Sequence, residues 1–378
     1  MKNKLLHITS DFSNQKLYVN LVRNISKSNI TQMVYVPVRW EHQIDGNRDD
    51  SIENVEYYYS FVLKRNIFFK LRFNRKIRII LSDLESKINI KEVGFVHAHF
   101  LFSDGAVAYK MKKKYDTPYN VSVRATDLHY FFPLMPHLRK LGNQIMEEAN
   151  NVIFINHAYK DIFKKRYLKL SFESILNKIT VIPNAIHQRW FQTAVPEKKI
   201  KDGVRLLYVG RIIRRKKLDV LIQAIKEMNA TSNEKYTLEI VGNGEFLSKI
   251  KKIANDSVIF HSEIRNAEQL KKIYNRCHIF IMPSVKETFG LVYIEALSQG
   301  LPIIHCINEG VSGYFKKREV SVEVLPNNTR EIVDGVHFIQ QHYEKMSSKA
   351  KLLSKTFNWD EVTNKYLATY PVNCLIED

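Results

Sequence analysis

Two glutamates with seven residues between them mark the stretch of this sequence with the clearest chemical potential. Glu287 follows an apolar run, residues 279–282, that stops at Pro283, and Glu295 lies in a segment whose apolar residues recur at helical spacing. The pattern predicts a strand, a short loop and a helix ended by Gly300. Helix N-termini bind phosphate, and carboxylates accept hydrogen bonds from sugar hydroxyls. We therefore expect a ligand with both groups, although two surface glutamates could show the same spacing.

A run of basic residues follows another predicted strand. The apolar segment 204–209 leads into Gly210, and five of the seven residues from Arg211 to Lys217 are basic. We expect this run at the carboxyl end of a strand, where a doubly wound sheet holds its ligand. Arg211 and Lys216 could clamp a diphosphate, Arg by its planar fork and Lys as a point charge. The alternative is a solvated charge run on the surface.

The rest of the chain supplies the elements that must position these residues. Strands and helices alternate in both halves, which indicates two doubly wound, Rossmann-like α/β domains. The length of 378 residues and the hydrophobic content of 45% suit two globular domains. We place the first at residues 1–185, with a returning helix at 359–378, and the second at residues 203–355. The loop Ser10 to Gln15 has no glycine, so no glycine-rich phosphate loop is expected there.

Histidine and cysteine residues are the candidate metal ligands of this sequence. His97 and His99 end a predicted strand, and residues two apart share one face of a strand. They could chelate a metal, but no third ligand is evident nearby. The alternative places one histidine in the core and the other at the rim of a cleft. Three widely spaced cysteines, at 277, 306 and 374, suggest neither a disulfide framework nor a zinc site, so a reducing cytosol is the expected compartment.

The charge is concentrated in the first half of the chain. Of the net +19, an excess of 13 comes from residues 1–190, which hold 30 Lys and Arg against 17 Asp and Glu. Such a field favours nucleic acid, an anionic membrane surface or a phosphorylated substrate. Residues 64–78 contain seven basic residues and three phenylalanines without an acid. They could form a helix packed on the core, or a basic amphipathic helix lying on anionic lipid. The sequence contains no run of about 18 apolar residues, so no membrane span is predicted.

Several short segments, in their order along the chain, resemble family four of the retaining glycosyltransferases. They are Ile182-Pro183-Asn184-Ala185, Val209-Gly210-Arg211 with Lys216, Val241-Gly242-Asn243-Gly244, Glu287 to Glu295 with Phe289-Gly290 inside, and the ending Phe357 to Leu367. The resemblance implies the GT-B architecture, two Rossmann-like domains facing across a cleft. It also implies a nucleotide-sugar donor, a UDP- or GDP-sugar, as substrate. Neither a cofactor nor a metal is expected, and no Asp-x-Asp is present.

The resemblance also assigns roles to individual residues. Arg211 and Lys216 would neutralise the diphosphate leaving group, Glu287 would bind a hydroxyl of the transferred sugar, and Glu295 would hold the ribose. The other expected donor-binding residues are Gly210, Gly242, Asn243, Gly244, Phe289, Gly290 and Leu291.

The acceptor-side loop departs from the family pattern. The family often has histidine before Gly/Ala-x-Asp, whereas Arg124-Ala125-Thr126-Asp127 has arginine. We include Arg124 and Asp127 among the candidate catalytic residues. The arginine could favour a phosphorylated or acidic acceptor, or it could form a structural salt bridge to Asp127.

These observations predict a hexosyltransferase at the cytosolic face of the membrane, with residues 64–78 on anionic lipid. Its acceptor is expected to be lipid-linked or a polysaccharide, as in bacterial capsule, exopolysaccharide or lipopolysaccharide synthesis. One alternative is a retaining transferase with a soluble or protein acceptor. Another is a GT-B protein that has lost catalysis and binds a polyanion. No nucleic-acid partner is expected, since no nucleic-acid module is recognisable.

Overall fold

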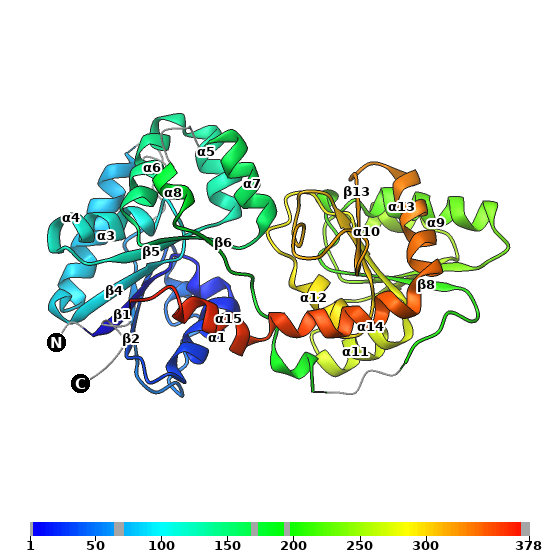
Figure 1. Ribbon diagram of the computed structural model, residues 1–378, viewed down its shortest axis with the longest axis horizontal. Helices are drawn as coiled ribbons and strands as arrows, with labels where there is room; N and C mark the ends of the chain where they lie inside the picture. Colours follow the sequence, from blue (N-terminus) through cyan, green and yellow to red (C-terminus); the bar gives the residue numbers. More distant parts are fainter. Residues whose placement is uncertain (1–2, 64–71, 168–172, 193–196, 372–378) are drawn as a thin grey trace. The chain divides into compact units, whose positions relative to one another are not determined.

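The structure, a computed structural model, describes residues 3–63, 72–167, 173–192 and 197–371 (Figure 1). The chain divides into two compact units. The first comprises residues 1–155, 160–184 and 359–378, and the second comprises residues 156–159 and 185–358. Each unit has its own parallel sheet, so the prediction of two parallel α/β sheets is confirmed.

The first unit is built on a seven-stranded sheet in the order β3-β2-β1-β4-β5-β6-β7. The strands are β1 (Lys4–Ile8), β2 (Gln32–Pro37), β3 (Val55–Ser60), β4 (Val93–Ala98), β5 (Tyr119–Val123), β6 (Asn151–Phe154) and β7 (Ile179–Val181). The helices are α1 (Lys16–Ser26), α3 (Phe73–Lys87), α4 (Gly105–Tyr115), α5 (Phe132–Leu134), α6 (Arg139–Glu148), α7 (His157–Arg166), α8 (Glu173–Leu176) and α15 (Trp359–Leu367). The central strands β1, β2, β4 and β5 are buried almost throughout, as expected for a parallel sheet covered on both faces.

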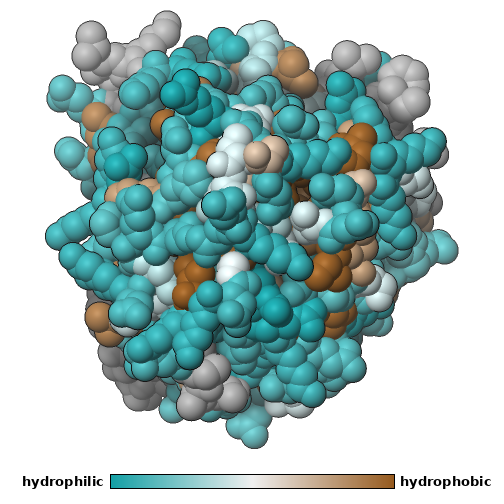
Figure 2. Space-filling view, turned by 90° about the vertical axis from the view of Figure 1, so that its right-hand side faces the viewer, coloured by the Kyte–Doolittle hydropathy of each residue, from teal (hydrophilic) through white to brown (hydrophobic). Residues whose placement is uncertain are grey.

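The second unit is built on a six-stranded parallel sheet in the order β10-β9-β8-β11-β12-β13. The strands are β8 (Val204–Val209), β9 (Tyr236–Val241), β10 (Val258–His261), β11 (Ile279–Met282), β12 (Ile303–Cys306) and β13 (Ser321–Val324). The helices are α9 (Leu218–Thr231), α10 (Leu247–Ile253), α11 (Ala267–Arg276), α12 (Leu291–Ser298), α13 (Thr329–Gln341) and α14 (Tyr343–Ser354). The face seen in Figure 2 is largely hydrophilic, with small separate hydrophobic areas.

Strand order reverses once in each sheet, and this fixes where ligands can bind. In the first unit the chain steps outward from β1 to β3 and then restarts on the other side at β4. The second unit does the same between β8 and β11. At such a point the loops after two adjacent parallel strands diverge, which leaves a crevice at their carboxyl ends. The candidate residues Lys216 and Glu287 follow β8 and β11, so they lie beside this point.

The loop from Ser10 to Gln15, which has no glycine, is anchored in the core of the first unit by an aromatic side chain. Phe12 is fully buried in a cluster with residues of α1 and β2, including Val22 and Val34. A side chain that anchors this loop in the core takes the place of the open backbone turn that a phosphate loop requires. The backbone N–H of Ser10 donates instead to Asp104 Oδ2, at 3.3 Å.

The last described residues belong to the first unit and satisfy polar groups of its sheet. Helix α15 packs on α1. His97 Nδ1 lies 2.8 Å from the Tyr370 hydroxyl, and Asn120 Nδ2 donates to the Thr369 carbonyl at 3.1 Å. These groups are buried, so each would carry a desolvation cost if its partner were removed.

This contact gives a stability prediction. Tyr370→Phe removes the hydroxyl partner of His97 and is expected to lower the free energy of unfolding by about 1–2 kcal/mol. Tyr109→Phe is the matched control, because the structure shows no hydrogen bond from that hydroxyl. Urea unfolding of both variants measures the difference, and equal stabilities would contradict the assigned role of Tyr370.

Candidate functional site

Two loops of the second unit meet at the reversal of strand order between β8 and β11. The loop after β8 ends in a short 3₁₀ turn, Arg214–Lys216. The loop after β11 runs from Pro283 to Gly290 and enters α12. The Val285 N–H donates to the Arg215 carbonyl at 3.0 Å, which joins the two loops. The strand, loop and helix predicted around Glu287 are present.

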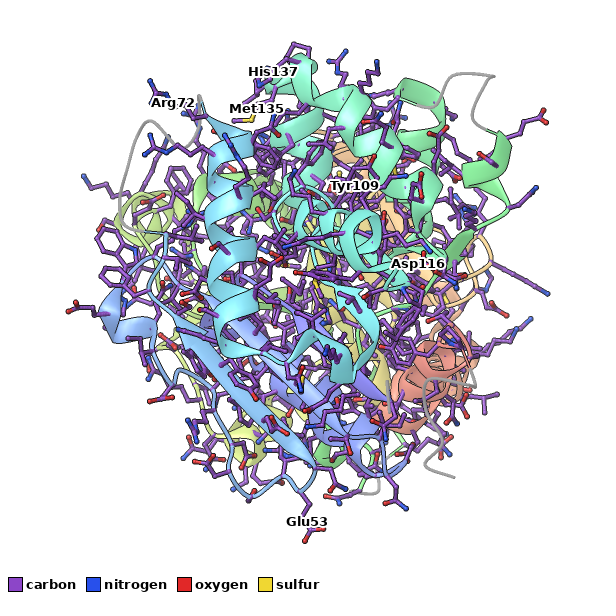
Figure 3. The ribbon with its side chains drawn as sticks, turned by 90° about the vertical axis from the view of Figure 1, so that its left-hand side faces the viewer. Glu53, Arg72, Tyr109, Asp116, Met135 and His137 are labelled. Atoms are coloured by element: carbon purple, nitrogen blue, oxygen red, sulfur yellow. The ribbon has the colours of Figure 1, made fainter. Side chains whose placement is uncertain are left out.

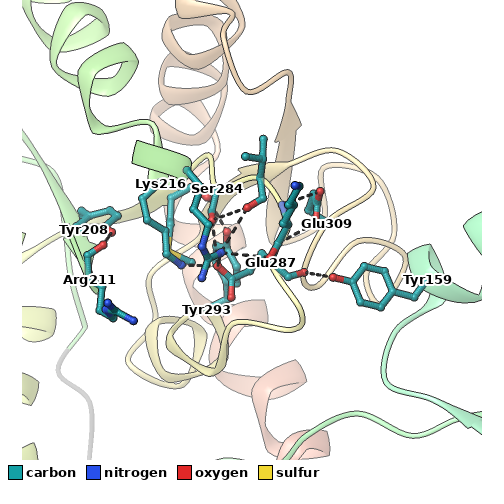
Figure 4. Close-up of polar contacts among 12 residues, drawn as sticks. Tyr159, Tyr208, Arg211, Lys216, Ser284, Glu287, Tyr293 and Glu309 are labelled. Carbon is teal, nitrogen blue, oxygen red and sulfur yellow. Dashed lines mark hydrogen bonds and ion pairs between the residues drawn. The ribbon is translucent and has the colours of Figure 1, made fainter. Parts of the chain in front are cut away.

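A buried ion pair lies where the loops meet (Figure 4). Lys216 Nζ contacts Glu287 Oε2, and both residues are at least nine-tenths buried. Ser284 Oγ donates to the same oxygen at 3.1 Å, and Arg215 Nη1 lies 3.7 Å from it. Burial lowers the pKa of Lys216, an effect that the nearby carboxylate opposes. The other oxygen, Glu287 Oε1, has no hydrogen-bond partner in the described part of the chain.

Open backbone donors follow Glu287. Within the described ranges, the N–H groups of Thr288, Phe289, Gly290 and Leu291 have no acceptor. They lead into the N-terminus of α12, whose dipole favours an anion. Gly290 has φ +74°, and a Cβ there would lie 2.7 Å from the Tyr293 ring. The site thus offers a buried cation, free amides and one free carboxylate oxygen, which suits phosphate beside a hydroxyl.

The predicted glycine turns allow two neighbouring loops to approach closely. A Cβ on Gly242 would lie 2.0 Å from the Gly210 carbonyl oxygen, and one on Gly244 would lie 2.3 Å from the Ile212 carbonyl oxygen. The Ile212 N–H donates to the Asn243 carbonyl at 2.8 Å, which ties the turns together. These contacts explain the glycines structurally. Donor binding by these residues stays a prediction.

The basic run divides into residues with different surroundings. Arg211 is exposed, and in Figure 4 its side chain lies to one side of the Lys216–Glu287 pair. Arg215 Nη1 donates to the Lys286 carbonyl at 3.2 Å and so braces the opposite loop. The structure therefore brings Lys216 and Glu287 together, while the Arg211 side chain has no partner among the described residues and can meet a ligand.

A model of the family described as glycosyl transferases group 1 matches residues 191–352. That range includes both loops and the glycine turns. Over these residues the chain is similar to the glycosyltransferases of family four.

Individual relatives agree with this similarity. The glycosyltransferase is 22% identical over 327 residues to an uncharacterized glycosyltransferase of Methanocaldococcus jannaschii, covering 82% of this chain and 85% of the relative. It is 28% identical over 208 residues to a 41.2 kDa protein in the cps region of Klebsiella pneumoniae, covering 51% and 55%. It is 23% identical over 271 residues to the lipopolysaccharide 1,2-N-acetylglucosaminetransferase of Salmonella typhimurium, covering 60% and 69%.

Solved structures share the whole fold. The lipopolysaccharide outer core galactosyltransferase WaaB superposes with a TM-score of 0.73 at 17% identity, covering 97% of this chain and 98% of that one. Anabaena HepE bound to UDP superposes with a TM-score of 0.70 at 14% identity, covering 97% and 99%, and HepE has also been solved with UDP-glucose. The predicted GT-B fold is confirmed.

Glu295 lies on α12 in the glycosyltransferase and is partly buried. Burial raises the pKa of its carboxyl to about 7, against the opposing effects of Arg189 and of a hydrogen bond with Tyr274. A carboxyl with a pKa of about 7 can donate a hydrogen bond when protonated and accept hydrogen bonds when ionised. Both are compatible with the predicted contact to the two ribose hydroxyls.

Arg124 and Asp127 lie in the first unit, after β5. Arg124 is buried, and its Nε donates to the His99 carbonyl at 3.2 Å. The Asp127 carboxylate accepts the backbone N–H groups of Arg124, Leu101 and Phe102, at 2.9, 3.2 and 3.3 Å. In the described structure no ion pair joins the two side chains, so the alternative of a structural salt bridge is not borne out. Asp127 fixes the loop, and a part for Arg124 in acceptor binding stays a prediction.

The histidines form a buried cluster, in which His7 is hydrogen-bonded to His99 and His97 stacks on His99, in place of the arrangement expected from the sequence. His99 is 1% exposed, so the prediction that one histidine lies at a rim is wrong. His7 supplies the third imidazole that the sequence did not reveal. Its Nε2 lies 3.0 Å from Gln32 Oε1, and its Nδ1 lies 3.0 Å from His99 Nε2. His97 contacts the hydroxyls of Ser122 and Tyr370. Among the described residues, His99 Nδ1 alone of the six ring nitrogens has no hydrogen-bond partner, and the three rings lie close enough together to hold a metal ion.

Several residues that shape the site were not found from the sequence. Arg215 and Ser284 both contact Glu287 Oε2. The Tyr159 hydroxyl donates to the Glu287 carbonyl at 3.1 Å, and Asn156 Nδ2 donates to the Thr288 carbonyl at 2.7 Å. Glu309 accepts two amides of the same loop. Only Arg215 carried a sequence signal, its place in the basic run.

The state of Glu295 gives a pH prediction. Because folding raises its pKa from 4.5 to about 7, the stability that this group contributes is present below pH 4.5 and is lost as the pH rises through 7. Glu295→Gln should therefore melt higher than the wild type at pH 8 and show little difference at pH 4.5. Glu344→Gln, at an exposed position on α14, is the control. Equal melting temperatures of Glu295→Gln and wild type at pH 8 would contradict the raised pKa.

Proposed function

We propose that this glycosyltransferase moves a hexose, with retention at the anomeric carbon, from a nucleotide sugar to a lipid-linked or polysaccharide acceptor. The observation that carries this proposal is the buried Lys216–Glu287 pair beside the open amides of residues 288–291. The relatives from the cps region and from lipopolysaccharide synthesis support a role in building bacterial surface polysaccharide. The UDP complexes of HepE support a UDP-sugar donor, with a GDP-sugar as the alternative.

The chemistry follows from where charge develops. When the bond between the anomeric carbon and the diphosphate oxygen breaks, positive charge grows on the sugar ring and negative charge on the diphosphate. Lys216, the free Arg211 side chain and the amides before α12 stabilise the diphosphate. Fixed donors aimed at a developing charge supply a large part of catalysis. Glu287 Oε1 accepts a sugar hydroxyl, while its Oε2 stays with Lys216. We propose that these groups suffice without a divalent metal.

The proposed association with a membrane depends on residues at one end of the first unit. Most of the predicted membrane segment, residues 64–71, lies outside the described residues. In the remainder, Phe73 and Ile77 are buried in the protein and so are unavailable to lipid. Lys76 is also buried, which lowers its pKa to about 8. An amphipathic helix lying on lipid is therefore not supported for residues 73–78.

A different surface fits anionic lipid better. We define the basic tip as Arg72, Arg75 and residues 133–140; Figure 3 shows Arg72, Met135 and His137 at the same end of the unit. Leu134 is 66% exposed, and the exposed side chains around it include Arg139 and Lys140. No acid occurs between residues 128 and 146. An apolar residue among cations suits the headgroup region of a bilayer. None of the helices in the described ranges is long and apolar enough to cross one.

The ion pair gives the central activity prediction. Lys216→Ala and Glu287→Ala should each lower kcat/KM for the nucleotide sugar by at least about 100-fold, because each removes a fixed group at the reacting centre. Each also leaves the other charge buried and unpaired, which destabilises the fold. The double variant Lys216→Met/Glu287→Gln removes both charges and should recover much of the lost melting temperature without recovering activity.

The control for these variants is Lys272→Ala, at an exposed position on α11. Thermal shifts with UDP, GDP, ADP and CMP would identify the nucleotide, since a ligand at 100 times its Kd stabilises by about 2.7 kcal/mol. Full turnover by all three site variants would reject the proposed function. Loss of wild-type turnover on adding EDTA would reject its metal-free form.

The basic tip gives a separate prediction. Arg72→Gln/Lys140→Gln should weaken binding to phosphatidylglycerol vesicles about 30-fold, because each cation near the surface contributes about 1 kcal/mol. Leu134→Glu should also weaken binding. Lys91→Gln, just before β4 and so at the opposite edge of the sheet, is the control. If sedimentation with vesicles does not respond to these substitutions or to salt, the proposed membrane association is contradicted. The proposed reaction of the nucleotide-sugar donor is unaffected by that result.

A further inference from the structure

We propose that Glu309 is a positioning residue that fixes the donor-site loop around Glu287. This inference rests on the proposed function of that site. Glu309 lies in the loop after β12, which is the strand next to β11 in the sheet. Its carboxylate reaches across to the loop after β11, as the close-up of the site shows (Figure 4).

The contact has the geometry of a clamp. Glu309 Oε1 accepts the Lys286 N–H and Oε2 accepts the Glu287 N–H, both at 2.9 Å. The next residue, Gly310, donates its own N–H to the Glu287 carbonyl at 2.9 Å. We call these three hydrogen bonds the amide clamp. Two of them have an ionised acceptor, and such bonds are stronger than neutral ones.

The clamp holds a backbone conformation that the loop would not prefer alone. Lys286 has φ +55°, in the left-handed region that a residue with a Cβ seldom occupies. Gly310 has φ +56°, and a Cβ there would lie 3.0 Å from the Phe289 carbonyl oxygen. The two loops can meet this closely because glycine occupies position 310. The clamp therefore opposes relaxation of Lys286 to an ordinary conformation.

The clamp also decides which amides face the ligand. The N–H groups of Lys286 and Glu287 are taken by Glu309, whereas those of residues 288–291 have no acceptor in the described structure. The Glu287 carbonyl is held from two directions, by Gly310 and by the Tyr159 hydroxyl. With its backbone fixed and its Oε2 held by Lys216, Glu287 can present only Oε1 to a sugar hydroxyl.

The surrounding charges support this assignment. Burial raises the pKa of the Glu309 carboxyl, and the nearby Glu287 carboxylate raises it further. The two amides and Arg215 oppose that rise. Arg215 also contacts Glu287 Oε2, so one guanidinium serves both carboxylates. A second carboxylate placed here against its own electrostatic cost points to a function in the loop.

The test separates hydrogen bonding from packing. Glu309→Gln keeps the size of the side chain but turns an NH₂ group toward one of the two amides, and Glu309→Ala removes both acceptors. If the clamp acts as proposed, both variants increase backbone amide hydrogen exchange at Lys286 and Glu287 at least about tenfold. Both should also lower kcat/KM for the nucleotide sugar by about tenfold or more, while the affinity for UDP alone changes less than threefold. Glu344→Gln and Glu344→Ala are the matched controls.

Each outcome decides one part of the proposal. Unchanged exchange at residues 286 and 287 in both variants overturns the clamp. Faster exchange with unchanged kcat/KM overturns its positioning role, and a Glu309→Gln variant that behaves as wild type shows that only packing matters. If wild-type protein turns over no nucleotide sugar, the proposed function fails, and the exchange measurement still tests the clamp by itself.

Discussion

The site depends on one constraint, that a charge removed from water must find a partner. Lys216 and Glu287 come from loops 71 residues apart, and both are buried where strand order reverses in the second sheet. Neither could occupy that position without the other, since a single buried charge costs several kcal/mol. The pair therefore specifies how the loops after β8 and β11 meet, and Arg215 and Ser284 reinforce the same arrangement.

This constraint explains why so much of the surrounding backbone is specialised. Gly210, Gly242 and Gly244 let the loops after β8 and β9 lie against each other. The loop after β8 continues into the 3₁₀ turn that carries Lys216. On the other side, Asn156, Tyr159 and Glu309 hold the carbonyls and amides of residues 286–288. Within these loops, as far as the described residues extend, a short row of amides and one carboxylate oxygen remain unsatisfied.

The sequence predicted the parts of this arrangement that local pattern controls. The strand, loop and helix around Glu287 follow from periodicity, and the closeness of Lys216 follows from its place at a strand end of the same sheet. The sequence analysis identified no strand at β12 or β13. Glu309 and His7 were missed because their partners depend on which strands become neighbours. Of the two alternatives for Arg124, the salt bridge to Asp127 is not present in the described structure, because that carboxylate accepts hydrogen bonds from backbone amides instead.

The return of the chain to the first unit has a consequence for the order of folding. Three side chains on the neighbouring strands β4, β5 and β6 are hydrogen-bonded to Thr369 and Tyr370; they are His97, Asn120 and Asn151. A ribosome makes these strands first and their partners only after the whole second unit. Until Thr369 and Tyr370 are synthesised, the side chains of His97, Asn120 and Asn151 must therefore be hydrated by water. Helix α1 likewise lacks its packing partner α15 until the end of synthesis. The second unit, continuous from residue 185 to 358, can complete its core first, so the half of the protein that begins earliest is the half that finishes last.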